Sequence, residues 1–233
     1  MNRPIDIKDL TIGYGEKIVQ SHLTLSLERG EMVCMLGRNG CGKSTLLRTI
    51  AGLQPVISGE YKIDDVAVVL TDKLRLDNTS IREVVAMGRY PYTSFLGALT
   101  IDDNRIIDAA MKEVGIDNAD SAFNALSDGE KQRVLIAKAL AQQTPVILLD
   151  EPTAHLDLPN RILVLQLLRR LAHEQGKTIL ISTHELELAL RLSDRILLLS
   201  DQGAQLDTAE HLKRTDAFTR AFGMDIFDVT SLS

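Results

Sequence analysis

The chain has 233 residues, of which 45% are hydrophobic and 25% are charged, a composition typical of a folded globular protein and not of a disordered one. Its net charge of −6 and its lack of tryptophan argue against nucleic acid as the main partner, because a phosphate backbone needs a basic surface and stacked bases need aromatic side chains. No apolar run approaches the roughly 18 to 20 residues that span a bilayer. No signal segment is recognised at the N-terminus, and two cysteines fit a reducing cytosol.

The first seventy residues are predicted to be mostly β, with short apolar stretches that alternate with polar residues or turns. Strands are expected over residues 5–12, 18–27, 32–36, 58–64 and 66–70, and a helix over residues 45–51. The turn Gly13-Tyr14-Gly15 is expected to separate the first two strands. Tyr14 has two interpretations, as an ordinary surface tyrosine or as an aromatic face on which an adenine ring stacks.

A glycine-rich loop between the third strand and the first helix fits the pattern Gly-x-x-x-x-Gly-Lys-Ser/Thr. In this setting, backbone N–H groups converge on phosphate oxygens at a helix N-terminus. Lys43 is predicted to supply a mobile charge for the terminal phosphates, and the hydroxyl of Ser44 is predicted to bind Mg²⁺. This stretch, called the phosphate loop below, consists of Gly37, Arg38, Asn39, Gly40, Cys41, Gly42, Lys43, Ser44 and Thr45. The alternative, a glycine-rich turn with a chance lysine, is disfavoured by the flanking strand and helix.

Residues 72–126 change in character, because charged helical patterns replace the strands. Helices are expected over 81–87 and 102–114, with a proline-containing loop at 88–92 between them. This segment is therefore predicted to be an inserted helical subdomain.

From residue 126 the chain alternates between helices and apolar strands. A helix starts at Ser127, where Glu130 completes a capping box, and continues to about residue 140. Further helices are expected over 159–171 and 186–192, and strands over 146–151, 178–182 and 196–199. Strands this apolar imply a parallel sheet covered on both faces. Ligands of such sheets bind beyond the carboxyl ends of the strands, which is where Gly37, Asp150 and His184 lie.

Two carboxylates end the strand at 146–151. Asp150 is in the position expected for a carboxylate that holds Mg²⁺ opposite Ser44, although a strand-end aspartate also acts as a turn or helix cap. Glu151 could polarise a water for in-line attack on a γ-phosphate. His184 could contact that phosphate or could be a loop histidine with ordinary hydrogen bonds.

Further motifs resemble those of the ATP-binding-cassette (ABC) ATPases. Residues 126–133 resemble the signature sequence of that family, residues 154–157 resemble its D-loop, and His184 resembles its switch histidine. The resemblance covers nearly the whole chain. It implies an α/β P-loop NTPase with a RecA-like parallel-sheet core, an N-terminal antiparallel β subdomain and an inserted α-helical subdomain. The single domain 1–233 would divide into 3–70, 72–126, 127–207 and a C-terminal segment 208–233.

The resemblance also implies a head-to-tail dimer with two ATP molecules between the subunits. Each nucleotide would contact Tyr14, the phosphate loop, Asp150, Glu151 and His184 of one subunit, and Ser127 and Gly129 of the other. Glu130 and Asp157 belong to the same implied nucleotide contacts, and Lys43, Glu151 and His184 are the implied catalytic residues. The capping box at Ser127 remains compatible with this role, because a capped helix N-terminus attracts anions.

Two residues depart from the family pattern. Asp128 stands at the third signature position, where the family has glycine and where a carboxylate would repel a γ-phosphate. Thr71 follows the strand at 66–70, where the family has a glutamine that touches Mg²⁺ and links the site to the membrane partner. A threonine hydroxyl reaches less far, so we expect an altered link between hydrolysis and transport.

The amino-acid sequences of residues 88–93, 153–157 and 184–190 are similar to those of ATPase subunits of bacterial importers for ferric siderophores, haem or cobalamin. This similarity implies a peripheral ATPase on the cytoplasmic face of the inner membrane. Its partners would be a second copy of itself, integral-membrane permease subunits and, indirectly, an extracytoplasmic substrate-binding protein, with no nucleic acid. The alternatives are a soluble ABC ATPase acting as a cytosolic assembly factor and a nucleotide-dependent regulatory module with weak turnover. Residues 225–229 are a possible strand, which suggests that the natural chain continues beyond Ser233.

Overall fold

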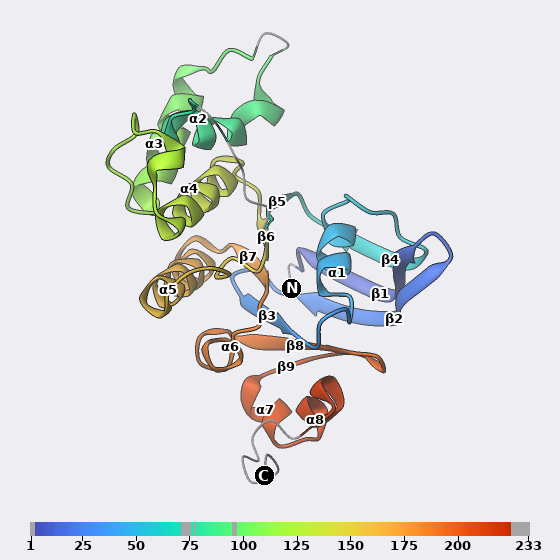
Figure 1. Ribbon diagram of the computed structural model, residues 1–233. Helices are drawn as coiled ribbons and strands as arrows, with labels where there is room; N and C mark the ends of the chain where they lie inside the picture. The colour runs from blue at the N-terminus through green and yellow to red at the C-terminus, as the bar shows by residue number, and fades with distance from the viewer. Residues whose placement is uncertain (1–2, 71–75, 77, 95–96, 225–233) are drawn as a thin grey trace.

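The computed structural model describes residues 3–70, 76, 78–94 and 97–224, which form two sheets with helices packed against them and a helical region at one end (Figure 1). The smaller sheet is antiparallel, with the order β2-β1-β4. Its strands are β1 (Ile5–Tyr14), β2 (Lys17–Leu27) and β4 (Ser58–Ile63). This sheet is the predicted N-terminal antiparallel β subdomain.

The larger sheet has six strands in the order β5-β6-β7-β3-β8-β9. These are β3 (Met32–Leu36), β5 (Val66–Val69), β6 (Val146–Asp150), β7 (Thr178–Ser182), β8 (Arg195–Ser200) and β9 (Gly203–Asp207). The first five in this order are parallel, as predicted, and β9 pairs with β8 in the antiparallel sense. The neighbouring stretches 58–64 and 66–70 therefore belong to different sheets.

The helices are α1 (Lys43–Ile50), α2 (Ile81–Ala86), α3 (Ile101–Glu113), α4 (Asp128–Ala141), α5 (Leu158–Gln175), α6 (Leu186–Leu192), α7 (Ala209–Lys213) and α8 (Ala217–Phe222). Two 3₁₀ helices are η1 (Met87–Tyr92) and η2 (Phe123–Ala125). None of the helices in the described part of the chain combines the length and apolarity needed to cross a membrane.

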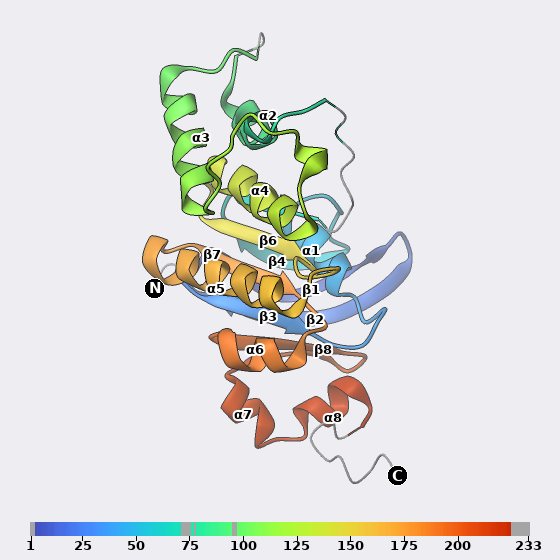
Figure 2. The ribbon, with the colours of Figure 1, turned by 60° about the vertical axis from the view of Figure 1, so that its left-hand side comes forward.

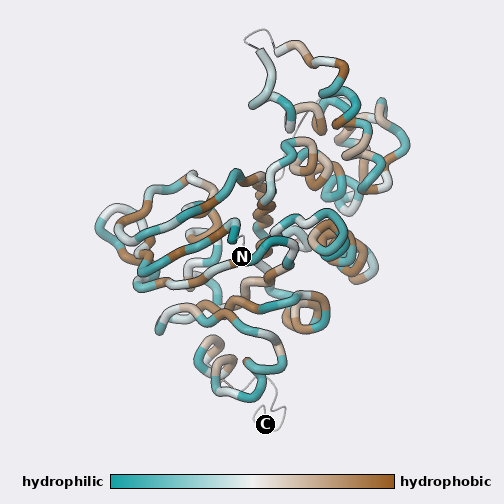
Figure 3. The backbone as a smooth tube through the Cα atoms, turned by 180° about the vertical axis from the view of Figure 1, so that it is seen from behind, coloured by the Kyte–Doolittle hydropathy of each residue, from teal (hydrophilic) through white to brown (hydrophobic). Residues whose placement is uncertain are grey.

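The core consists of two apolar layers, one on each face of the larger sheet. Along β3, Val33 and Met35 pack with α1 and the antiparallel sheet, whereas Met32, Cys34 and Leu36 pack with the helices on the opposite face. This alternation follows from the two-residue period of a strand. Figure 2 shows α5 lying across one face of the sheet, and Figure 3 shows apolar residues concentrated in its strands. The sheet is thus covered on both faces, which confirms the prediction.

The helical region stands at one end of the molecule and consists of α2, α3 and α4 packed against one another (Figures 1 and 2). Each of the three begins with a capping box, at Ser80 and Glu83, at Thr100 and Asp103, and at Ser127 and Glu130. The third of these helices, α4, begins at Asp128.

Two local predictions were wrong, and one strand was not predicted. The stretch 88–92 was predicted as a loop because it contains Gly88 and Pro91, yet it forms η1, which continues directly from α2. The turn predicted at Gly13–Gly15 starts later, because β1 pairs with β2 as far as Tyr14. The strand β9 was not predicted, since its sequence Gly-Ala-Gln-Leu-Asp lacks an alternating apolar pattern, and it forms by pairing with β8 across a short turn. The possible strand at 225–229 lies outside the described residues.

Candidate active site

The phosphate loop connects the end of β3 to the start of α1. At Gly37 the backbone passes so close to β8 that a Cβ atom would lie 2.4 Å from the carbonyl oxygen of Leu199. Gly42 adopts a left-handed conformation with φ of 105° directly before the helix, where a Cβ would lie 2.8 Å from Cγ1 of Val19. A side chain at either position would displace the loop. The glycine pattern is therefore required by close packing as well as by the turn.

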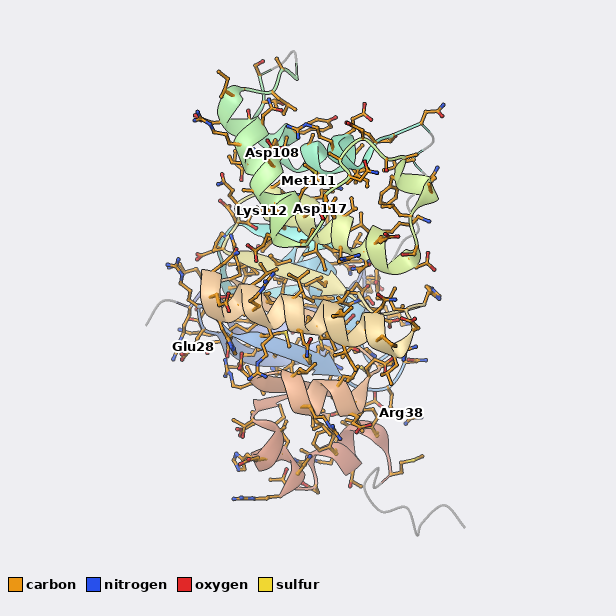
Figure 4. All side chains as sticks on the ribbon, turned by 90° about the vertical axis from the view of Figure 1, so that its left-hand side faces the viewer. Glu28, Arg38, Asp108, Met111, Lys112 and Asp117 are labelled. Carbon is orange, nitrogen blue, oxygen red and sulfur yellow. The ribbon has the colours of Figure 1, made fainter. Side chains whose placement is uncertain are left out.

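The N-terminus of α1 is open to an anion. Among the described residues no side chain caps it, and its first turn contains no acidic residue. Unpaired N–H groups and the helix dipole favour negative charge at such an end. Arg38, Asn39 and Gly40 are exposed in front of it. Arg38 also lies close to α8, because a Cβ on Gly223 would be 3.6 Å from its Nη1 atom (Figure 4).

Lys43 is folded over the loop and is 6% exposed. Its Nζ atom donates hydrogen bonds to the carbonyl oxygens of Gly37, at 2.8 Å, and Arg38, at 3.1 Å. An ammonium group has three N–H donors, so within the described residues a third remains for a phosphate oxygen. The ammonium group of Lys43, predicted to be mobile, is thus held by hydrogen bonds to the phosphate loop itself.

Gln20, which was not predicted as a site residue, is hydrogen-bonded to the backbone of the phosphate loop. Its side chain is 5% exposed, and its Nε2 donates to the carbonyl oxygens of Cys41, at 2.7 Å, and Ser200, at 2.8 Å. Burial raises the pKa of the Cys41 thiol, an effect that nearby Lys43 only partly opposes. Cys41 is therefore a neutral packing residue in the loop, and its predicted nucleotide contact is left to its backbone N–H.

Asp150 faces Ser44 at the carboxyl end of β6. The Ser44 hydroxyl donates to Oδ1 of Asp150 at 3.2 Å, and the hydroxyl of Ser182, at the end of neighbouring β7, donates to the same oxygen. Mg²⁺ is commonly bound by one or two carboxylates, with waters and substrate phosphates completing its octahedron. One carboxylate beside one hydroxyl, at the mouth of a phosphate loop, fits that donor set. No group of three or more His, Cys, Asp or Glu side chains suited to a metal occurs among the described residues.

Glu151 and His184 interact with each other next to Asp150. Nε2 of His184 lies 2.7 Å from Oε1 of Glu151, and both side chains are partly exposed. The backbone of Glu151 is left-handed, with φ of 48°, which is a strained conformation for a side chain of this size. Its N–H is held by the carbonyl oxygen of Ser182, at 3.1 Å, and by the Ser182 hydroxyl, at 2.9 Å. This backbone conformation places the partly exposed carboxylate of Glu151 beside Asp150.

Tyr14 lies at the edge of the loop. Its ring is 51% exposed, and its hydroxyl is 3.2 Å from the hydroxyl of Thr45. This hydrogen bond fixes the ring next to the first turn of α1, where a nucleobase could stack on its open face.

The remaining predicted contacts lie on other elements and do not bond to the loop within the described residues. Ser127 and Glu130 bond to each other in the capping box of α4, with Ser127 Oγ 2.7 Å from Oε2 of Glu130. Asp157 caps α5 by accepting from Asn160. Gly129 packs against Asn160, so that a Cβ there would be 2.9 Å from the amide side chain. Thr71 lies outside the described residues.

Sequence reasoning missed Gln20, Ser182 and Asn160. Ser182 had a usable signal, because a polar residue that ends an apolar strand two positions before His184 shares the sheet edge with Asp150. Gln20 had only a weak signal, since it is a polar residue in a predicted β stretch. Its hydrogen-bond partners lie far away in the sequence, at residues 41 and 200.

Comparison with known proteins identifies similar sequences and structures. A family model described as "ABC transporter" matches residues 20–154. The iron(3+)-hydroxamate import ATP-binding protein FhuC of Bacillus subtilis is 36% identical over 97% of this chain and 90% of its own. A solved structure described as a metal-chelate type ABC transporter in an inward-facing conformation has a TM-score of 0.88 at 29% identity, covering 94% of this chain and 89% of the other. The dimeric structure of MJ0796, a bacterial ABC transporter cassette, has a TM-score of 0.73 at 28% identity, covering 88% and 98%.

Proposed function

Since the chain belongs to the family of ABC transporter ATP-binding subunits, which are ATPases coupled to transport, we propose that it powers the import of a metal chelate through a separate membrane permease. The proposed cargo class is a ferric siderophore, haem or cobalamin. The name of the FhuC relative and the description of the similar transporter structure support this class over a cytosolic assembly factor or a weakly active regulatory module.

The observation that carries the proposal is the meeting of two strand-end carboxylates with the phosphate loop. Asp150 faces the Ser44 hydroxyl, and Glu151 is held beside it in a strained conformation within reach of His184. A structural role for these residues would not require a left-handed glutamate whose carboxylate remains accessible to water. Phosphoryl transfer, by contrast, needs one carboxylate for a metal ion and another group for the attacking water.

Each residue then has a defined role. The loop N–H groups and Lys43 bind and orient the phosphates, and Ser44 and Asp150 would hold Mg²⁺. When bound, the ion would neutralise charge on the β- and γ-phosphate oxygens. Glu151 accepts a proton from the water whose oxygen attacks the γ-phosphorus as the bond to the ADP oxygen breaks. His184 keeps the Glu151 carboxylate in place and is within reach to contact the γ-phosphate.

The second half of each nucleotide site is proposed to come from another copy of the chain. Ser127 is exposed beside the N-terminus of α4, and in the described part of one subunit this end of the helix makes no bond to the phosphate loop of the same subunit. The dimeric structure of the similar cassette MJ0796 supports this arrangement. Hydrolysis should therefore depend on protein concentration, with little turnover in monomeric samples.

A cavity of about 650 Å³ between the sheet and the helical region is the proposed docking site for the permease. Its lining includes Tyr61 and Tyr92, which are 56% and 54% exposed, and the acidic residues Asp64 and Asp65. No Lys, Arg or His occurs among the described residues that line it. Cytoplasmic loops of membrane proteins carry an excess of Lys and Arg, so an acidic cavity with aromatic walls complements such a loop. This contact would hold the subunit at the cytoplasmic face of the inner membrane.

The test of the ATPase role is Glu151→Gln, which keeps the size of the side chain and removes its basicity. We expect nucleotide affinity to persist and phosphate release to fall by about 10²- to 10⁴-fold, the usual contribution of general base catalysis. Glu174→Gln, on an exposed position near the end of α5, is the matched control and should have normal turnover. Normal turnover in Glu151→Gln would remove Glu151 from the proposed role.

The transport role is tested by comparing cells that carry the wild-type chain with cells that carry the Glu151→Gln variant. Cells with Glu151→Gln should lose uptake of one class among labelled ferric siderophores, haem and cobalamin, and unchanged uptake of all three would contradict the cargo proposal. Reversing both charges of the cavity, Asp64→Lys with Asp65→Lys, should release the subunit from the membrane fraction while ATP binding persists. Retention of the double variant on membranes would contradict the docking site.

A further inference from the structure

Arg89 lies in η1 and bonds to two separate helices of the helical region. Its side chain is 8% exposed, and its Nε donates to Oδ1 of Asp103, in the first turn of α3, at 2.8 Å. Its Nη1 donates to the carbonyl oxygen of Ala141, the last residue of α4, at 2.8 Å and to the side-chain oxygen of Gln143 at 3.2 Å. A guanidinium group presents its N–H donors in a rigid fork, so one side chain fixes both helices at once.

The residues beside Arg89 attach η1 to the same end of α4. Gly88 lies directly on the helix, where a Cβ would be 2.3 Å from the carbonyl oxygen of Lys138. The hydroxyl of Tyr92 donates to the carbonyl oxygen of Gln142 at 2.6 Å, and the Arg89 guanidinium lies 4.2 Å from the centre of the Tyr92 ring. Orphan carbonyl groups at a helix C-terminus need such partners. In this chain η1 provides them.

The opposite end of α4 carries Ser127, the exposed serine of the signature sequence. The helix has 14 residues and is therefore about 21 Å long. It contains no proline or internal glycine after Gly129, so a displacement of its C-terminal turn is carried to its N-terminus. Because Tyr92 also lines the acidic cavity, η1 connects that cavity to the far end of α4.

We infer that Arg89 is a positioning residue that fixes the C-terminal turn of α4 to η1 and so sets where Ser127 meets the nucleotide of a second subunit. The inference rests on the proposed function, because it assigns Ser127 to the site of the partner copy. Arg89 touches neither the nucleotide nor the reacting atoms. Its effect is on the assembly of the composite site, and it makes η1 the segment through which a contact at Tyr92 reaches that site.

The test measures ATP-driven dimerisation in the Glu151→Gln background, which blocks turnover. Arg89→Lys retains the charge beside Asp103 and loses the fork that reaches Ala141 and Gln143. We expect ATP affinity of the monomer to stay unchanged and ATP-driven dimerisation to weaken by about 2- to 30-fold, the range of measured coupling effects. Tyr92→Phe removes only the hydroxyl bond to Gln142 on an exposed ring, which avoids a folding defect, and should weaken dimerisation by a smaller factor.

The matched control is Arg82→Lys. Arg82 is also an arginine that joins two helices, since it extends from α2 to Asp108 and Asn104 of α3, and among the described contacts it has no bond to α4. A lowered melting temperature with normal dimerisation is expected for this variant. Parental dimerisation in Arg89→Lys, or an equal loss in Arg82→Lys, would overturn the inference while leaving the proposed function intact. A parent protein that fails to dimerise with ATP would instead overturn the proposed function and, with it, the inference.

Discussion

The Ser182 hydroxyl joins the two carboxylate residues of the active site, so Ser182→Ala tests how that site is held. The hydroxyl is buried, donates to Asp150 Oδ1 and accepts from the N–H of Glu151. After its removal, Asp150 keeps the longer bond from Ser44 at 3.2 Å, and the Glu151 N–H keeps the Ser182 carbonyl oxygen at 3.1 Å. The main loss is thus one hydrogen bond to a buried carboxylate.

A bond of that kind contributes about 1.5 to 3 kcal/mol. For a chain of this size about 1 kcal/mol corresponds to a melting-temperature change of about 2 to 4 °C, so we expect a decrease of about 3 to 12 °C. The left-handed backbone of Glu151 also loses one of its two restraints, and we expect kcat to fall by about tenfold with little change in KM for ATP, because the loop itself is intact.

Thermal unfolding followed by circular dichroism and a phosphate-release assay measure the two effects. Ser193→Ala is the control, since the Ser193 hydroxyl donates a hydrogen bond to the carbonyl oxygen of Ala189 but lies away from both carboxylates. If Ser182→Ala and Ser193→Ala unfold at the same temperature and hydrolyse ATP equally well, the Ser182 hydroxyl does not hold the site.

Two further variants test charges in the helical region. Asp128→Gly removes an exposed carboxylate from the first turn of α4, and ATP-driven dimerisation measured by sedimentation should strengthen by up to about fivefold; a weaker dimer would show that Asp128 faces away from the phosphates. Hydrogen bonds from Thr100, reinforced by Arg89, lower the pKa of Asp103 from 3.8 to about 2, so ionised Asp103 stabilises the fold above about pH 4, and this contribution is lost as the pH falls through about 2. Urea unfolding of wild type and Asp103→Asn should therefore show a stability difference that shrinks between pH 4 and pH 2, and a difference that stays constant would refute the assignment.

The parts of the site that sequence reasoning predicted are those governed by local or edge rules. The phosphate loop is a contiguous strand, turn and helix, so its signal lies within a dozen residues. Asp150 and His184 are far apart in sequence, but the carboxyl ends of parallel strands share one edge of the sheet. The pairing of β6 with β7 brings the two ends together, and Glu151 follows as the next residue.

The parts that were missed depend on contacts that no local pattern encodes. Gln20 holds a loop 21 residues away and a carbonyl group 180 residues away. Arg89 follows a glycine and precedes a proline by two residues, which predicts a loop, yet its bonds to Asp103 and Ala141 stabilise a 3₁₀ helix there. Tertiary hydrogen bonds therefore outweighed the local tendency of Gly88 and Pro91 to end a helix.

The capping box at Ser127 also limits how this serine can bind a phosphate. Its hydroxyl has one proton, which it donates to Oε2 of Glu130, and the bonds from Ser127 lower the pKa of Glu130, so the acceptor is ionised at neutral pH. A phosphate oxygen also accepts, so the hydroxyl must leave Glu130 to reach it. Glu130 would then keep the hydrogen bond from the Ser127 N–H, at 2.9 Å. Losing part of a cap costs about 1 kcal/mol, so the proposed nucleotide contact at Ser127 would be opposed by the helix that presents it, and release of the nucleotide would restore the cap.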